Sequence, residues 1–102
     1  MIDLDEYQKQ MIASICKKLS VKKLFLFGSA ITGTFRSSSD MDFAVLFSEE
    51  LSPLEHGEAF FELKDELEAL FLRDVDLISY RVVTNPIFKR ELDGTKVELY
   101  AA

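Results

Sequence analysis

An acidic pair at the start of an apolar segment limits the range of folds open to this chain more than any other feature. Asp40-Met41-Asp42 leads into residues 41–47, which read MDFAVLF. Because successive side chains of a β-strand alternate between faces, Asp40 and Asp42 are expected on one face. The side chains expected to point into a core are Met41, Phe43, Val45 and Phe47. The pattern predicts a strand that carries two carboxylates side by side.

Two carboxylates held this close repel each other, and one takes up a proton unless a cation neutralises both. Oxygen ligands of this kind suit hard divalent cations. The pair of Asp40 and Asp42 therefore indicates a metal site. The alternative is a strand that begins in water, where acidic residues are common.

A glycine-serine turn precedes the acidic pair. Residues 23–27 (KLFLF) have the length and composition of a strand, and this segment stops at Gly28-Ser29. Gly28 permits close approach of a ligand to the backbone, and Ser29 offers a hydroxyl and an amide that suit a phosphate. The segment matches neither the dinucleotide-binding nor the Walker pattern. An ordinary turn is the alternative.

A third acid lies further along the chain. Asp76 is embedded in Val75-Asp76-Leu77-Ile78, a short apolar segment of strand type. Asp74 is the rival candidate, since it would share a face with Asp76 if the strand already began there. We prefer Asp76 because Val75 and Leu77 flank it.

The remaining pattern predicts helices around these strands. Ser52-Pro53-Leu54-Glu55 is a capping box with proline at the first helical position, and Asn85-Pro86 begins a second, short helix that ends near Gly94. The expected elements are a helix over 3–19, strands over 23–27, 40–47 and 75–80, a helix from 53 to about 72, and a strand or extended tail over 95–100. These elements predict a single domain over 1–102 of the α+β class, a small mixed β-sheet with helices packed on it.

Helical spacing selects the residues expected to face the core. The first helix carries Leu4, Tyr7, Met11, Ile15 and Leu19 at that spacing, and the long helix carries Leu54, Phe60, Leu63, Leu67, Leu70 and Phe71. The opposite side of the long helix is acidic and is interpreted as a solvated face. Its residues are Glu58, Glu62, Asp65, Glu66 and Glu68.

Composition excludes several functions. The formal charge of −6 disfavours general nucleic-acid binding, which requires many lysine and arginine contacts with phosphates. With one cysteine, Cys16, and one histidine, His56, the chain lacks the parts for structural zinc, an intrachain disulfide or a Cys-His nucleophile. No apolar segment approaches the ~20 residues that span a bilayer, and the acidic start is unlike a secretory signal, so the expected compartment is the cytoplasm.

The order of these motifs resembles the minimal nucleotidyltransferase family of the polymerase-beta-like superfamily over nearly the whole chain. The resemblance implies the polymerase-beta-like palm, in which the strands bearing Asp42 and Asp76 are neighbours. It implies that Asp40, Asp42 and Asp76 bind Mg²⁺ or Mn²⁺ as catalytic residues, and that Gly28 and Ser29 bind the phosphates of ATP.

The chain departs from the family at one point. Many members carry arginine shortly after the glycine-serine pair, whereas this chain has Ala30-Ile31-Thr32. Arg36, in the following loop, is the candidate replacement at the phosphates. A solvated loop arginine is the alternative.

The resemblance also implies a function. Minimal members typically pair with a small all-helical HEPN-type protein, and some transfer AMP to a tyrosine of that partner and neutralise a toxin. By analogy the chain is expected to be a metal-dependent protein adenylyltransferase and the antitoxin of such a pair. The alternative, which Ala30-Ile31-Thr32 permits, is a non-catalytic antitoxin that binds nucleotide or partner and neutralises by complex formation. A homodimer is compatible with either.

Overall fold

The computed structural model describes residues 4–27 and 41–102. Within these ranges the chain forms three α-helices, one 3₁₀-helix and four β-strands. In chain order the elements are α1 (Glu6–Lys18), β1 (Val21–Phe27), β2 (Met41–Phe47), α3 (Pro53–Phe71), β3 (Val75–Ser79), η1 (Tyr80–Val82), α4 (Pro86–Thr95) and β4 (Val97–Ala101).

The strands form one mixed sheet in the order β3-β2-β1-β4. The central strands β1 and β2 are antiparallel, and β4 pairs antiparallel with the other edge of β1. β3 runs parallel to β2. Parallel neighbours need a long crossover connection, which α3 supplies between β2 and β3. The α+β class and the mixed sheet predicted from the sequence are confirmed.

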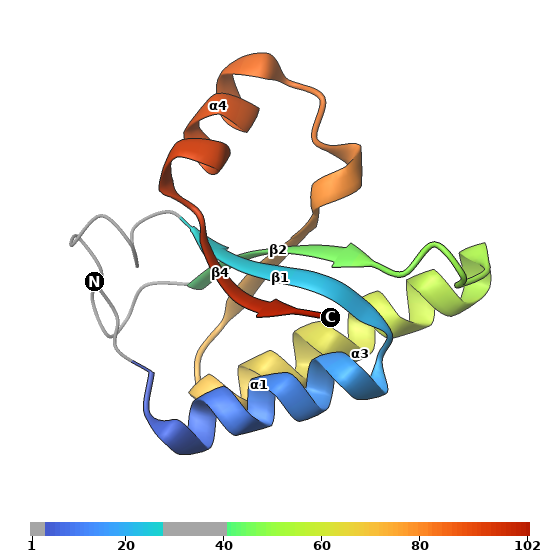
Figure 1. Cartoon of the computed structure of the whole chain (residues 1–102), viewed down its shortest axis with the longest axis vertical. Coiled ribbons are helices and arrows are strands. Elements are labelled where there is room, and N and C mark those ends of the chain that lie inside the picture. The colour runs from blue at the N-terminus through green and yellow to red at the C-terminus, as the bar shows by residue number, and fades with distance from the viewer. Residues whose placement is uncertain (1–3, 28–40) are drawn as a thin grey trace.

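Helices α1 and α3 cover one face of the sheet, and α4 lies on the opposite side (Figure 1). The α1 and α3 side holds the larger core, to which β2 contributes Met41, Phe43, Val45 and Phe47. These are the four side chains that the alternation of the sequence assigned to a core. The predicted end of this strand at Phe47 and its facing are therefore confirmed, and Asp40 lies outside the described residues.

A smaller core fills the space between the sheet and α4. Phe25 and Phe27 of β1, Ala44 of β2 and Leu92 of α4 are its buried members. Because β1 presents Leu24 and Leu26 to the larger core, its apolar residues are divided between the two faces of the sheet. This division explains why residues 24–27 are continuously apolar rather than alternating.

Side chains satisfy the first backbone N–H groups of each long helix. The Ser52 hydroxyl accepts from the Glu55 N–H at 3.2 Å, and the Glu55 carboxylate accepts from the Ser52 N–H at 3.0 Å. The predicted capping box is therefore confirmed. An equivalent box of Asp5 and Gln8 starts α1, so this helix begins at Glu6 and not at residue 3.

The buried stripe of α1 agrees with the predicted one only in part. Ile15 and Leu19 are buried as expected, whereas Tyr7 is largely exposed. Ile12 and Cys16, which were not predicted, are buried as well. Because 3.6 residues form a turn, the spacing i, i+3, i+4, i+7 fits both stripes, and packing against α3 and β1 decides between them.

Other boundaries and faces shift by small amounts. β1 begins two residues before the predicted strand, β3 ends at Ser79, and α3 ends at Phe71. Leu54, which we expected on the apolar side of α3, is exposed. The acidic side of this helix is only partly solvated, because Lys18 of α1 pairs with Glu62 and Glu66 at 3.3 and 2.8 Å.

The C-terminal segment is a strand and not a loose tail. β4 pairs with β1, and an ion pair of 3.6 Å joins Lys23 to Glu98. Burial raises the pKa of the Cys16 thiol to about 12, which agrees with a core role for this cysteine. In residues 4–27 and 41–102, no helix combines the length and apolar character that crossing a membrane requires.

Replacing Ser52 by alanine should destabilise the protein by about 1 kcal/mol, because the N-cap acceptor of α3 is lost. Urea unfolding followed by circular dichroism measures this change. Ser14→Ala on the exposed surface of α1 is the matched control, and it should be neutral or slightly stabilising because alanine favours a helix interior. Equal losses in the two variants would contradict the capping role.

Candidate active site

Asp42 and Asp76 face each other across neighbouring strands. In the parallel pairing of β2 and β3, Asp42 lies opposite Asp76, while its antiparallel neighbour on β1 is Phe27. The three residues form one row across the sheet. Since neighbouring strands are about 4.8 Å apart, the backbones of the two acids are adjacent.

Both carboxylates lie on the α4 side of the sheet. Ala44 and Ile78, two residues beyond each acid, belong to the smaller core under α4, and side chains two apart in a strand share a face. Asp42 is half-buried and Asp76 is exposed. The prediction that the strands bearing Asp42 and Asp76 are neighbours is confirmed. The roles of the two acids stay predictions.

Asp76 lies within β3, whereas Asp74, the other candidate third acid, lies outside the strand. Asp74 precedes β3, where its carbonyl accepts a hydrogen bond of 3.2 Å from the Met41 N–H. This bond aligns the starts of β2 and β3 and fixes the register that sets Asp76 opposite Asp42. The Glu68 carboxylate also holds the start of β3, accepting from the Val75 N–H at 3.1 Å.

Four predicted site residues fall outside the described residues. These are Gly28, Ser29, Arg36 and Asp40. The described chain stops at Phe27 and resumes at Met41, and both ends lie beside Asp42. The end of β1 and the start of β2 thus lie at the same end of the sheet as the two acids.

The described part of the site supplies two of the three carboxylates expected to bind metal. Within residues 4–27 and 41–102, no group of three or more acidic, histidine or cysteine side chains is arranged to hold an ion. The donors that do meet, Asp42 and Asp76, are carboxylate oxygens, which suit Mg²⁺ or Mn²⁺. The third predicted donor is Asp40.

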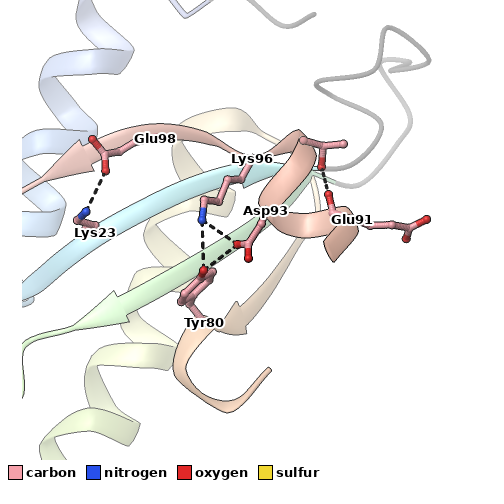
Figure 2. A network of polar contacts seen from close by, with 7 residues as sticks. Lys23, Tyr80, Glu91, Asp93, Lys96 and Glu98 are labelled. Atoms are coloured by element: carbon pink, nitrogen blue, oxygen red, sulfur yellow. Dashed lines mark hydrogen bonds and ion pairs between the residues drawn. The ribbon is translucent and has the colours of Figure 1, made fainter. Parts of the chain in front are cut away.

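A polar network joins the C-terminal end of α4 to Tyr80 at the start of η1 (Figure 2). The Tyr80 hydroxyl donates to the Asp93 carboxylate at 2.7 Å, and the Lys96 ammonium donates to Tyr80 and Asp93 at 3.2 and 2.8 Å. The same ammonium lies 4.9 Å from the ring centre of Phe25. None of the sequence motifs singled out Lys96. The i,i+3 spacing of Asp93 and Lys96 was the available signal.

Charge pairing in the network shifts two pKa values. The hydrogen bond from Lys96, then that from Tyr80, lowers the pKa of Asp93, and the bond to Asp93 raises the pKa of Lys96. A carboxyl group whose pKa is lowered by folding stabilises the fold at pH values above its pKa in the unfolded chain. An ammonium group whose pKa is raised by folding stabilises the fold at pH values below its pKa in the unfolded chain. The pair therefore loses its contribution as the pH falls through the folded pKa of Asp93 or rises through that of Lys96.

An aromatic contact brings α4 close to the row of acids. The rings of Phe27 and Phe88 meet edge to face, with centroids 6.0 Å apart and an interplanar angle of 72°. Phe27 is nearly buried, whereas Phe88 keeps 37% of its surface exposed. Nothing in the sequence motifs singled out Phe88, because its relevance arises from how α4 folds back onto β1.

A separate cleft of about 690 Å³ lies at the opposite end of the central strands. Its lining includes Val21 at the start of β1 and Ser48 just after β2, whereas the acids lie near the other ends of these strands. Its acidic lining residues are Glu49 and Glu50, which no strand pairing sets opposite each other. We place the candidate site at Asp42 and Asp76, which do not line this cleft.

Comparison with known proteins agrees with this fold. A family model described as polymerase beta, nucleotidyltransferase matches residues 10–102. Two proteins of Methanocaldococcus jannaschii carry protein adenylyltransferase in their names. One is 31% identical over 91 residues, which are 89% of this chain and 92% of the relative. The other is 34% identical over 76 residues, which are 74% of each chain.

Solved structures show the same architecture. A toxin–antitoxin crystal structure with AMP-PNP matches with a TM-score of 0.69 and 25% identity, over 92% of this chain and 73% of that chain. A structure named for a minimal nucleotidyltransferase matches with a TM-score of 0.67 and 27% identity, over 89% and 87%. An MNT antitoxin complex with a tri-AMPylated HEPN toxin from Shewanella oneidensis shares the fold, with a TM-score of 0.64 and 22% identity over 97% and 74%.

A mixed α+β sheet with acids on neighbouring parallel strands defines the nucleotidyltransferase class of palm. The family match extends over both strands and all three described helices, and it begins inside α1. The chain belongs to the polymerase beta nucleotidyltransferase family, and within it to the minimal nucleotidyltransferases. The resemblance inferred from the sequence is confirmed, and the protein is a nucleotidyltransferase.

Leu92 should anchor α4 over the site, because it is the buried residue of that helix. We expect Leu92→Ala to cost about 2–5 kcal/mol of unfolding free energy, the usual range for truncating a buried leucine. Chemical denaturation measures the loss. Ile87→Ala on the exposed side of α4 is the control, and it should stay within about 0.5 kcal/mol. A similar loss in both variants would contradict the anchoring role.

Proposed function

We propose that this protein transfers AMP from ATP to a hydroxyl group of a partner protein. The observation that carries the proposal is the pairing of Asp42 with Asp76 on the α4 face of a nucleotidyltransferase palm. Relatives named as protein adenylyltransferases support a protein acceptor. The toxin–antitoxin structure with AMP-PNP supports ATP as the nucleotide.

The chemistry assigns distinct tasks to the acids. Asp40, Asp42 and Asp76 hold divalent metal, Mg²⁺ or Mn²⁺, which when bound neutralises charge that develops on the phosphate oxygens. Asp76 orients the acceptor hydroxyl and accepts its proton. As the acceptor oxygen bonds to the α-phosphorus, the bond from that phosphorus to the bridging oxygen breaks and pyrophosphate leaves.

The remaining proposed contacts are made by residues around the acids. Gly28 and Ser29 hold the nucleotide phosphates through backbone N–H groups and a hydroxyl, and Arg36 supplies positive charge there. These assignments rest on the sequence motif. Cations held by Asp40, Asp42 and Asp76 would offset the overall negative charge locally, which would allow an acidic protein to bind a polyanion.

The proposed acceptor is a tyrosine of a small, all-helical HEPN-type toxin, which AMP transfer would neutralise. The toxin–antitoxin structure at 25% identity supports such a pairing. A second candidate function is neutralisation by complex formation without catalysis. The observation that favours it is the absence of arginine from Ala30-Ile31-Thr32, where many family members place a cation. A homodimer and a cytoplasmic location are compatible with both functions.

Incubation with the HEPN-type partner, Mg²⁺ and ATP labelled at the α-phosphate should give a labelled partner. We expect Asp42→Asn to reduce labelling to background, because an amide cannot replace a metal-binding carboxylate. Asp76→Asn should lower kcat far more than it raises the KM for ATP, since its loss acts on the hydroxyl. Gel autoradiography and mass spectrometry locate the label.

Asp74→Asn is the matched control for this experiment, because it removes a carboxylate two residues from Asp76 that lies outside β3. It should retain labelling. Activity that survives in Asp42→Asn would contradict the metal assignment, and loss in Asp74→Asn alone would make Asp74 the third ligand. Tight partner binding without any label would favour neutralisation by complex formation.

Nucleotide and metal together should stabilise the folded protein. At AMP-PNP concentrations one hundred times the dissociation constant, with Mg²⁺ present, the gain should be about 2.7 kcal/mol. Differential scanning fluorimetry should show a raised Tm for the unmodified protein and a much smaller rise for Asp42→Asn. Equal rises in the two proteins would show that Asp42 does not bind the metal–nucleotide complex.

A further inference from the structure

Phe88 occupies an unusual position for an exposed aromatic residue. It lies on α4, and its ring meets Phe27, which is the row neighbour of Asp42. Only the Phe27 side chain therefore separates the Phe88 ring from Asp42, and all three residues lie on the same face of the sheet. Phe61, another exposed phenylalanine, belongs to α3 beneath the opposite face.

The packing of α4 leaves part of this ring open. Leu92 lies one turn further along the helix and is fully buried against the sheet, so it anchors the helix. Phe88 shares the sheet-facing side with Leu92 but retains 37% exposure. The network of Tyr80, Asp93 and Lys96 holds the C-terminal part of α4 in place. Phe88 is thus a fixed aromatic ring with accessible surface.

We propose that the nucleobase of the bound nucleoside triphosphate stacks on Phe88. The inference rests on the proposed function, which places the triphosphate at Asp42 and Asp76. A base joined to that triphosphate through its ribose must lie near the acids. Phe88 is a partly exposed aromatic residue close to them. The support from Phe27 keeps the ring ordered before the nucleotide arrives.

Stacking determines what Phe88 would recognise. Contact between an aromatic side chain and a base is worth about 1–3 kcal/mol and tolerates every base, because each base has a π-face. Phe88 would therefore add affinity for nucleosides over plain polyphosphate without choosing adenine over guanine. It is a binding residue, and the chemistry stays with the acids.

Isothermal titration calorimetry of the full chain with Mg²⁺ tests this proposal. Phe88→Ala should weaken AMP-PNP binding about 5- to 150-fold, the equivalent of the stacking energy. The binding of inorganic tripolyphosphate, which has no base, should not change. Phe88→Trp should bind AMP-PNP at least as well as the unmodified protein, and Phe88→Leu, which keeps apolar packing on Phe27, should resemble Phe88→Ala.

Ile87→Ala and Phe61→Ala are the controls, because they remove exposed apolar side chains next to Phe88 and on the opposite side of the molecule. Both should bind AMP-PNP normally. In turnover assays Phe88→Ala should raise the KM for ATP with little change in kcat, the pattern of lost ground-state binding.

Other outcomes would overturn the inference in distinguishable ways. Unchanged AMP-PNP affinity in Phe88→Ala would end it while leaving the proposed function intact. Equal weakening of AMP-PNP and tripolyphosphate would show that Phe88 only maintains the fold of the site. If the unmodified protein bound neither ligand, the proposed function would fail, and the base contact with it.

Discussion

The parallel pairing of β2 with β3 is the interaction on which this site is built. It brings two acids that are 34 positions apart in the sequence onto adjacent backbones, because its register sets Asp42 opposite Asp76. A slip of one residue would turn one of them to the face that α1 and α3 cover. Backbone and side-chain contacts at the start of β3 hold this register, through the Asp74 carbonyl and the Glu68 carboxylate. The juxtaposition of the two acids thus depends on main-chain hydrogen bonds.

The two faces of the sheet differ in how much apolar surface they bury, and the acids lie on the face with the smaller core. The face under α1 and α3 buries most of the apolar side chains, which supplies the hydrophobic free energy of folding. The other face has a smaller core of four buried residues beneath α4, so polar and charged groups are tolerated beside it. An exposed Asp76 on such a face can meet substrate without the high cost of burying a charge. The site therefore lies where the fold depends least on apolar packing.

Helix α4 shows how a short element can be held with little buried area. Leu92 provides apolar burial, the Tyr80–Asp93–Lys96 network provides polar contacts, and Phe88 meets Phe27 at the N-terminal end. Aromatic and cationic contacts of this kind each contribute modestly, and together they fix a helix of ten residues. The family resemblance in the sequence came from the strands and the glycine-serine motif, so the packing of α4 on the acid-bearing face of the sheet was not anticipated from it.

Local pattern was sufficient for the elements of this protein. Alternation identified β2 and its buried face, and the Ser52–Glu55 box identified the start of α3, because both signals arise between residues within one turn or one pleat of each other. The motif order also predicted the family and the adjacency of the strands with Asp42 and Asp76. The flanking Val75 and Leu77 already favoured Asp76 over Asp74. The register that sets Asp76 opposite Asp42, the full buried stripe of α1, and the placement of Phe88 and Lys96 beside β1 came only from the folded chain. Each of these depends on contacts between residues distant in sequence, and a periodicity that fits two faces equally well cannot say which one the neighbouring elements will cover.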